Sequence, residues 1–158
     1  MPNWIINEVE VTGSREAIDR AAALIADEGK VDFNRVHPMP EKFISHPNEV
    51  HVGYPNGNVW ALAEWGTKWN AQDSGKIKTA ASDGSIGWYF SSAWSAPEAW
   101  FHALLAKLKA EGISVAITLT YADPMEWTGA WIECDTLGVV TQGNMRRKEV
   151  TKFLGENV

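Results

Sequence analysis

The order in which two hydrophobic repeats follow one another is the feature that most constrains how this chain can fold. Apolar and polar side chains alternate along Trp4–Thr12 and again along Val115–Tyr121, which is the period of a half-buried β-strand. Along Ser14–Glu28 and Pro97–Glu111, apolar residues instead recur every three or four positions, as on one face of an amphipathic helix. Because each strand is next to one of these helices in the sequence, helices packed on a sheet can bury both apolar faces. We therefore predict an α+β fold.

Shorter segments complete this pattern. We expect strands at Val31–Val36, Ile86–Ser92 and Trp127–Cys134, a hairpin partner for the last at Leu137–Gln142, and a closing helix at Met145–Leu154. The first six elements then run strand, helix, strand, strand, helix, strand. This order matches the split β-α-β arrangement of ferredoxin-like folds, in which two helices cover one face of an antiparallel sheet. We expect one such domain over residues 1–158, with the hairpin and the last helix added at its end.

A long insertion, at about residues 41–83, separates the second and third predicted strands. It is rich in tryptophan, glycine and proline, with a short helix expected at Val59–Trp65, capped by Asn58 and ended by Gly66. A connection of this length in a small domain tends to be functional or to hold structure of its own. Trp4 and Ile6 make the second face of the sheet apolar, so we expect the insertion to be ordered and to cover part of that face.

Composition restricts the function and the location. The net charge of −6 argues against a general nucleic-acid binder, which needs a basic surface to release counterions. A single cysteine, Cys134, excludes an internal disulfide and favours a reducing compartment. The N-terminal residues lack the pattern of a signal peptide, and no apolar run is long enough for a membrane helix. We expect a cytoplasmic protein of a bacterial host cell, without membrane contact.

Two segments with aromatic residues are candidates for protein or ligand binding. The string Trp65-Gly66-Thr67-Lys68-Trp69 has two indoles around a lysine, which suits a platform for a ring or a side chain, with Lys68 contacting an anion. The alternative is that both indoles anchor the insertion to the sheet. Trp94 precedes the helix that begins near Pro97, where free backbone amides can bind an anion. The alternative for Trp94 is a packed corner residue.

Two further polar features have less specific interpretations. Asn7 lies on the apolar face of its strand, where an unpaired amide would cost about 1–3 kcal/mol. We therefore expect a structural bond from Asn7 to a loop backbone, that of the insertion. Arg146, Arg147 and Lys148 form a dense basic segment that could contact nucleic acid or an acidic partner. The alternative is a solvated terminal helix whose cations complement the acidic first third of the chain.

No motif names a reaction. The histidines and the cysteine lack the spacing of metal ligands, and no glycine-rich loop is present to hold phosphates. The carboxylates around the last hairpin fit a solvated edge better than an acid–base pair; they are Asp123, Glu126, Glu133 and Asp135. We predict no catalytic residue, no metal and no cofactor.

Four strings in the chain belong together: Met1-Pro2-Asn3-Trp4, the Trp65–Trp69 string, Ser92-Ala93-Trp94-Ser95-Ala96-Pro97 and, more weakly, Tyr121–Gly129. In their order and spacing they resemble the YubB/Api-like family of small phage and plasmid proteins. The resemblance spans roughly residues 1–131, and it implies a ferredoxin-like domain from a mobile genetic element. It departs from the family at Ile5, where we associate the family with cysteine, and at Ala96, where we expect proline. No family activity carries over.

Three function classes follow. The leading hypothesis is a non-enzymatic binding protein of a phage or plasmid that occludes a host protein or complex, such as an anti-CRISPR or anti-restriction inhibitor. Indoles are good anchors, and negative charge competes for basic grooves. The alternatives are a single-stranded nucleic-acid-binding module, which would use exposed aromatics on the sheet, and a small-molecule enzyme with a pocket between insertion and sheet.

Overall fold

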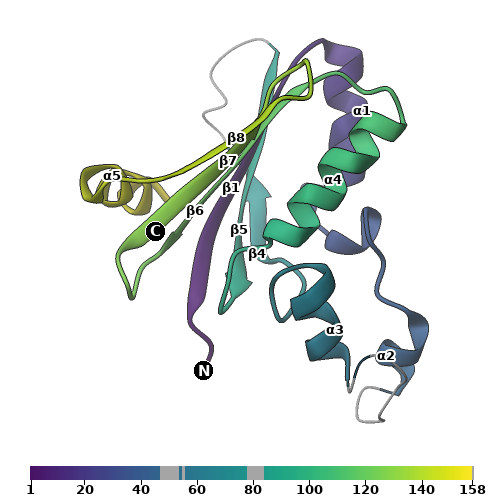
Figure 1. The fold of residues 1–158 in the computed structure, drawn as a ribbon, viewed down its shortest axis with the longest axis vertical. Coiled ribbons are helices and arrows are strands. Elements are labelled where there is room, and N and C mark those ends of the chain that lie inside the picture. The colour runs from purple at the N-terminus through teal and green to yellow at the C-terminus, as the bar shows by residue number, and fades with distance from the viewer. Residues whose placement is uncertain (47–53, 55, 78–83, 158) are drawn as a thin grey trace.

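A computed structural model describes residues 1–46, 54, 56–77 and 84–157. Among these residues, six strands form one antiparallel sheet in the order β4-β5-β1-β6-β7-β8 (Figure 1). The strands of this sheet are β1 (Trp4–Thr12), β4 (Gln72–Lys76), β5 (Ser85–Ala93), β6 (Ala116–Asp123), β7 (Thr128–Cys134) and β8 (Val140–Asn144). The helices are α1 (Arg15–Ile25), α2 (Glu41–Ser45), α3 (Gly57–Glu64), α4 (Glu98–Ala110) and α5 (Arg147–Asn157). The α+β prediction is confirmed, and the sheet is larger than that of a simple ferredoxin-like fold.

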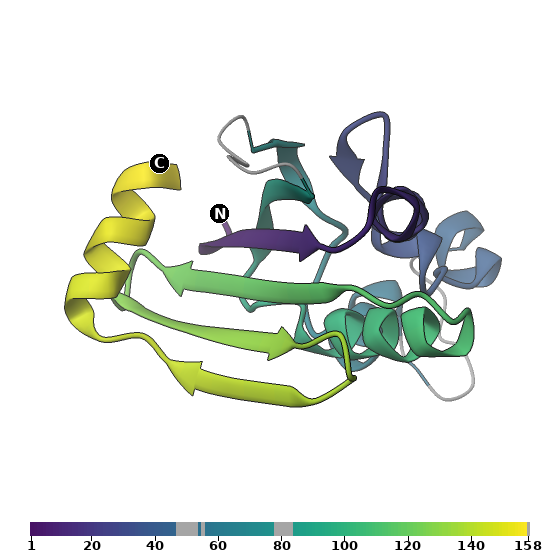
Figure 2. The same cartoon turned by 90° about the horizontal axis from the view of Figure 1, so that it is seen from above.

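Strand β1 lies in the middle of the sheet, and the alternation of its side chains defines the two sheet faces. It pairs with β5 on one side and β6 on the other, so its alternating side chains point to opposite faces. Val9 and Val11 are fully buried on one face, which α1 and α4 cover in Figure 2. Ser14 caps α1, because its hydroxyl accepts from the backbone N–H of Ala17 at 3.2 Å.

The predicted second strand, Val31–Val36, is wrong. The chain reverses at Glu28 and Gly29, both with positive φ, in a small hairpin between β2 (Ala26–Asp27) and β3 (Lys30–Val31). A 3₁₀ turn over Phe33–Arg35 follows. The Phe33 side chain of this turn is fully buried. The alternation that resembled a strand therefore comes from single side chains that a turn directs into the core.

Strand β4 takes the place beside β5 that we expected for Val31–Val36. It comes from within the predicted insertion, and its sequence, Gln-Asp-Ser-Gly-Lys, has no apolar alternation. The insertion therefore contributes to the sheet itself.

We expected the insertion to cover part of the second sheet face, and its Trp69 lies there against Trp4, with ring centres 6.0 Å apart. The buried indoles of the insertion, Trp60 and Trp65, belong to the core on the α1 and α4 side of the sheet. The C-terminal helix α5 also packs on the second face, burying Val150, Phe153 and Leu154 next to Ala122. The short helix of the insertion is confirmed as α3, although Asn56 rather than Asn58 caps it. Residues 47–53, 55 and 78–83 of the insertion lie outside the described residues.

None of the described helices has the length and apolar character needed to span a membrane.

Candidate functional site

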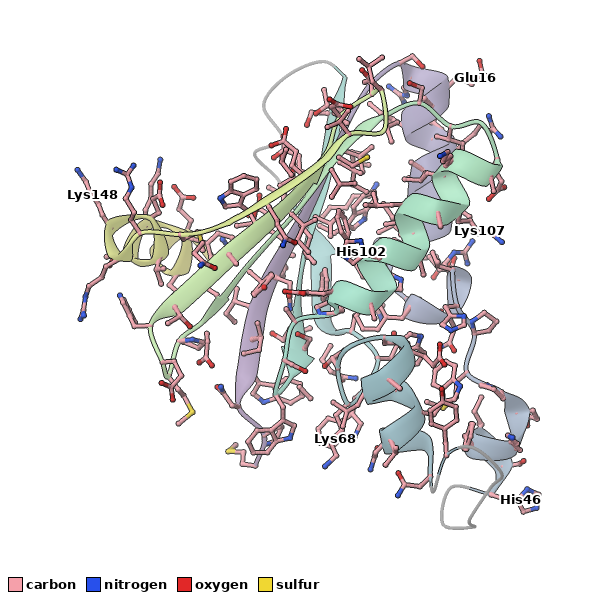
Figure 3. The ribbon with its side chains drawn as sticks, in the orientation of Figure 1. Glu16, His46, Lys68, His102, Lys107 and Lys148 are labelled. Carbon is pink, nitrogen blue, oxygen red and sulfur yellow. The ribbon has the colours of Figure 1, made fainter. Side chains whose placement is uncertain are left out.

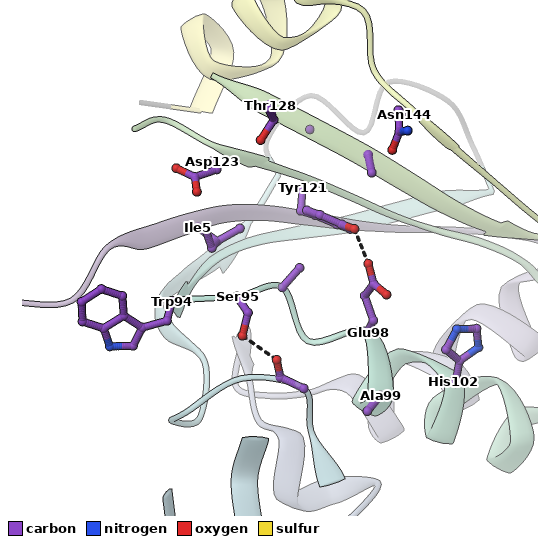
Figure 4. Close-up of a pocket in the computed structure, with 14 residues that line it drawn as sticks. Ile5, Trp94, Ser95, Glu98, Ala99, His102, Tyr121, Asp123, Thr128 and Asn144 are labelled. Carbon is purple, nitrogen blue, oxygen red and sulfur yellow. Dashed lines mark hydrogen bonds between the residues drawn. The ribbon is translucent and has the colours of Figure 1, made fainter. Parts of the chain in front are cut away.

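A cleft of about 730 Å³ lies between the first turns of α4 and the strands β6, β7 and β8 (Figure 4). Helix α4 covers the middle of the sheet, and the outer strands continue beyond it on the same face (Figure 2). The side chains that give the cleft its chemistry are Trp94, Ser95, Glu98, His102, Tyr121, Asp123, Thr128 and Asn144.

Trp94 stands at the rim of this cleft. It follows the last residue of β5, and its φ of +71° lies in the left-handed region. That region is unusual for a bulky residue and costs on the order of 1–3 kcal/mol. Its backbone N–H donates to the carbonyl of Asn3 at 2.8 Å, while its side chain remains 52% exposed. The surrounding structure thus holds a large indole in solvent against its own conformational preference.

The chain turns a corner between the end of β5 and the start of α4, and Trp94 lies at this corner. The Trp65-Gly66-Thr67 segment holds the corner in place. The Thr67 hydroxyl donates to the carbonyl of Ala93 at 2.8 Å, and the Ser95 hydroxyl donates to the carbonyl of Gly66 at 2.6 Å (Figure 4). One hydrogen bond therefore ties the residue before Trp94 to this segment, and another ties the residue after it.

This arrangement favours glycine at position 66. Its φ is +87°, and a Cβ there would lie 3.1–3.3 Å from the backbone of Ala96, Glu98 and Ala99. A side chain at this position would be strained by the positive φ and would push these backbone atoms apart, so glycine favours the close approach of the segment to the start of α4.

Asn7 supports the same corner from inside the sheet. It is fully buried, and its amide donates to the Ser92 hydroxyl at 2.9 Å and to the carbonyl of Ile5 at 3.1 Å. The Ser92 hydroxyl in turn donates to the carbonyl of Ser95 at 2.8 Å. The bonds of Asn7 therefore reach β1 and β5, whereas we expected them to reach the backbone of the insertion.

The cleft is acidic. Asp123 accepts from the Asn3 amide at 3.0 Å and from the backbone N–H groups of Met125 and Glu126 at 2.8 and 3.1 Å. Burial alone would raise the pKa of Asp123, but these hydrogen bonds outweigh it and hold the pKa below its usual value. Asp123 is therefore negatively charged at neutral pH.

A second carboxylate, that of Glu98, accepts a hydrogen bond from the Tyr121 hydroxyl across the cleft (Figure 4). Burial, and then this bond, raise the pKa of Tyr121, so the phenol stays neutral and acts as a donor. The described lining residues include no lysine or arginine to balance the two carboxylates.

This arrangement suits binding a cation better than an anion. Two of the amides at the start of α4 that we expected to be free are used within the protein, since Glu98 N–H donates to Ala96 and Trp100 N–H donates to Trp65, at 2.9 and 3.0 Å. An indole beside carboxylates can hold a guanidinium or ammonium group by charge and by contact with the ring.

The described residues include no group of three or more metal-ligating side chains. Burial, with a contribution from Asp135, raises the pKa of the Cys134 thiol, which keeps it protonated. A cluster of His37, Tyr54 and Glu64 lies outside the cleft, where His37 meets two residues of the insertion. There the Glu64 carboxylate is 2.9 Å from His37 Nε2 and accepts from the Tyr54 hydroxyl at 2.5 Å.

The structure separates the residues of the expected two-indole platform. Trp65 is only 2% exposed, and its indole N–H donates to the carbonyl of His37 at 2.8 Å, so it cannot serve as a binding surface. Trp69 is 37% exposed and lies against Trp4, with ring centres 6.0 Å apart. The Lys68 ammonium is 5.5 Å from the centre of the Trp69 ring.

The basic segment lies apart from Lys68. Arg146, Arg147 and Lys148 lie at the start of α5, and Figure 3 shows Lys148 on this helix, far from Lys68 in both the sequence and the view. Arg146 forms an exposed ion pair with Glu149 at 3.3 Å. The two basic elements therefore do not form one shared surface.

Sequence reasoning missed Glu98 and Tyr121 and assigned Asp123 to a solvated edge. The weak Tyr121–Gly129 string was the one sequence signal that pointed toward this part of the cleft.

The fold and the cleft together define an α+β protein with an acidic cleft that has an exposed indole at its rim. The structure is similar to the crystal structure of protein api92 from Yersinia pseudotuberculosis, assigned to family DUF1281. The TM-score is 0.66 and the sequence identity 10%, and the match covers 92% of this chain and 99% of the other. This similarity shows a shared fold. No family model matches the sequence, and no curated protein matches it either.

Proposed function

We propose that this chain is a non-enzymatic binding protein and that its cleft takes a basic segment of a partner protein. The observation that carries the proposal is Trp94, an indole held in solvent by a buried hydrogen-bond network, in a strained backbone conformation, at the rim of an acidic cleft. Strained backbone conformations of this kind cluster at functional sites. Exposed indoles are the residue type most enriched at binding hot spots.

The preferred occupant is an arginine-rich or lysine-rich loop. The carboxylates of Glu98 and Asp123 supply the attractive charge, and Trp94 supplies a flat ring on which a guanidinium can stack. Complementary charge speeds association and disfavours acidic partners. A cleft of about 730 Å³ has room for a few side chains.

The biological form of the proposal is inhibition of a host defence complex. CRISPR and restriction complexes hold nucleic acid in basic grooves, so an acidic protein that binds such a groove blocks it. The proposal keeps the assignment to the YubB/Api-like family and to a phage or plasmid, with action in the host cytoplasm. The fold similarity to api92 supports the family part of this proposal at the level of the shared fold.

We also propose that β4-β5-β1-β6 is a ferredoxin-like unit to which β7, β8 and α5 have been added. The strand order supports this proposal, because β1 and β4 both run antiparallel to β5, which lies between them. Helix α1 follows β1 and α4 follows β5, as in a split β-α-β arrangement.

A nucleic-acid module is disfavoured by the second sheet face, where such modules stack bases. Glu8 and Glu10 alternate along β1 on that face. Burial, together with the nearby charges of Glu10 and Glu156, raises the pKa of Glu8 in spite of a hydrogen bond from Asn157. Phosphates would be repelled by this group of glutamates.

Capture of partners from a nuclease-treated bacterial lysate tests the proposal. Tagged full-length wild type, Trp94→Ala and Trp69→Ala are compared, followed by affinity measurement with the purified partner. We expect Trp94→Ala to weaken binding about 30-fold, as for a hot spot of about 2 kcal/mol, and Trp69→Ala to change it less than threefold. Asp123→Asn should lower the association rate and its dependence on salt.

Equal retention by Trp94→Ala and wild type would contradict the assignment of the cleft. Tight, salt-sensitive binding of a bare oligonucleotide by the purified wild type would contradict the choice of a protein partner.

A further inference from the structure

The two outer strands of the sheet differ in how their free edges are protected. Exposed edges are usually protected by charges, bulges or proline, because they can otherwise pair with another chain. Strand β4 has such protection: its register shifts between Gln72 and Gly75, Asp73 has a positive φ of 50°, and Lys76 adds a charge.

Strand β8 lacks these protections. Its sequence, Val-Thr-Gln-Gly-Asn, contains no charge and no proline, and its register with β7 is regular from Val140 to Asn144. Within the described part of the chain no strand pairs with its outer side, and Figure 2 shows no ribbon beyond it. Helix α5 turns back under β6 and β7, which leaves this edge uncovered.

The free hydrogen-bonding groups of β8 can be assigned. The Val139 carbonyl accepts from Asp135 at 3.0 Å, and the Met145 N–H donates to Gly129 at 2.8 Å, so odd-numbered residues bond toward β7. In an antiparallel ladder alternate residues point the other way. The N–H and C=O groups of Val140, Gln142 and Asn144 therefore point outward from the sheet.

We propose that β8 pairs antiparallel with β8 of a second copy of this chain, around a twofold axis at Gln142. This register places Val140 of each copy opposite Asn144 of the other. It gives every outward N–H and C=O group of β8 a hydrogen-bond partner. The apolar residues beside the strand, Leu137 and Val139, are 87% and 55% exposed in the single chain and gain cover in the pair.

Charge also favours a second copy over an unrelated strand. The antiparallel arrangement brings the turn at Asp135 of one copy to the same end of the interface as Arg147 and Lys148 of the other. These two basic side chains have no ion pair among those found in the described residues. The twofold axis is perpendicular to the sheet, so both acidic clefts open on the same side of one continuous sheet.

Sedimentation velocity of the full chain over a range of concentrations tests the dimer. Wild type should sediment as a dimer, and Gln142→Lys should raise the dimer dissociation constant at least tenfold, because it places two like charges directly opposite each other. Thr141→Lys is the matched control: it adds the same charge one residue away, on the other sheet face and off the axis, and should change the constant less than threefold.

Hydrogen exchange identifies the interface. The amides of Val140, Gln142 and Asn144 should exchange slowly in concentrated wild type and fast in the Gln142→Lys variant. Circular dichroism confirms that both variants fold. Wild type that remains monomeric at every concentration would overturn the proposal, and so would a Gln142→Lys variant that dimerises as wild type does. Loss of partner capture by Trp94→Ala is independent of these outcomes.

Discussion

Replacement of Gly66 by alanine measures how strongly the corner that carries Trp94 is fixed. Two costs add in this variant. The φ of +87° costs a residue with a Cβ about 1–2 kcal/mol. The new methyl group also meets backbone atoms of the first turn of α4 at 3.1–3.3 Å, which cannot rotate away as a side chain would. Such crowding costs about 1–3 kcal/mol.

The free energy of unfolding should therefore fall by about 2–5 kcal/mol, or about 5–15 °C in melting temperature for a chain of this size. Gly112 and Gly138 provide matched controls, since their φ values are +66° and +84° and an added Cβ would meet nothing within 4 Å. Alanine at either control position should cost about 1–2 kcal/mol, which is the conformational term alone.

Urea denaturation of the three variants and of wild type separates the two costs. The difference between Gly66→Ala and the controls is the cost of the close approach to α4. If Gly66→Ala destabilises the protein no more than Gly112→Ala and Gly138→Ala do, the reasoning that the approach favours glycine is refuted.

Three further variants test the core and the electrostatics. Ser92→Ala removes the hydroxyl that accepts from the buried Asn7 amide, and it should cost about 1–3 kcal/mol in urea denaturation; a loss below about 0.5 kcal/mol would show that the network is dispensable. Glu8→Gln should raise the melting temperature at pH 7, because a group whose pKa is raised on folding destabilises the folded state above its ordinary pKa. That gain should vanish below about pH 4, where the side chain is neutral in both states, and its persistence at pH 3 would contradict the electrostatic cause. Leu104→Asp should abolish soluble folding, since Leu104 is fully buried, whereas Leu105→Asp at a partly exposed position should fold; a cooperative melt for Leu104→Asp would contradict the core assignment.

The sequence determined those elements whose burial pattern is contained within the segment itself. The predicted strand Trp4–Thr12 has the bounds of β1, and the predicted helix Pro97–Glu111 differs from α4 by one residue at each end. In both, apolar side chains repeat with the period of the element, because the element buries one face along its whole length. The composition likewise predicted an acidic, aromatic protein, and the cleft has that character.

Tertiary structure decided the elements that carry no such pattern. Strand β4 is polar and is a strand only because the backbone of β5 pairs with it. Val31–Val36 alternates but turns, because a reversal at Glu28 and Gly29 directs Phe33 into the core. The sequence also did not distinguish Trp65 from Trp69, since both flank the same lysine and only packing buries one of them.

The sequence could not predict the candidate site, because the site residues come from segments far apart in the chain. Glu98 and Tyr121 are 23 residues apart, on a helix and on a strand, and they meet only because α4 packs on the sheet beside β6. Trp94 could be named as a corner residue from its neighbours, but its exposure depends on hydrogen bonds from Thr67 and Ser95 to distant backbone groups. Local periodicity records which face of an element is buried, and it contains no information about which distant groups that burial brings together.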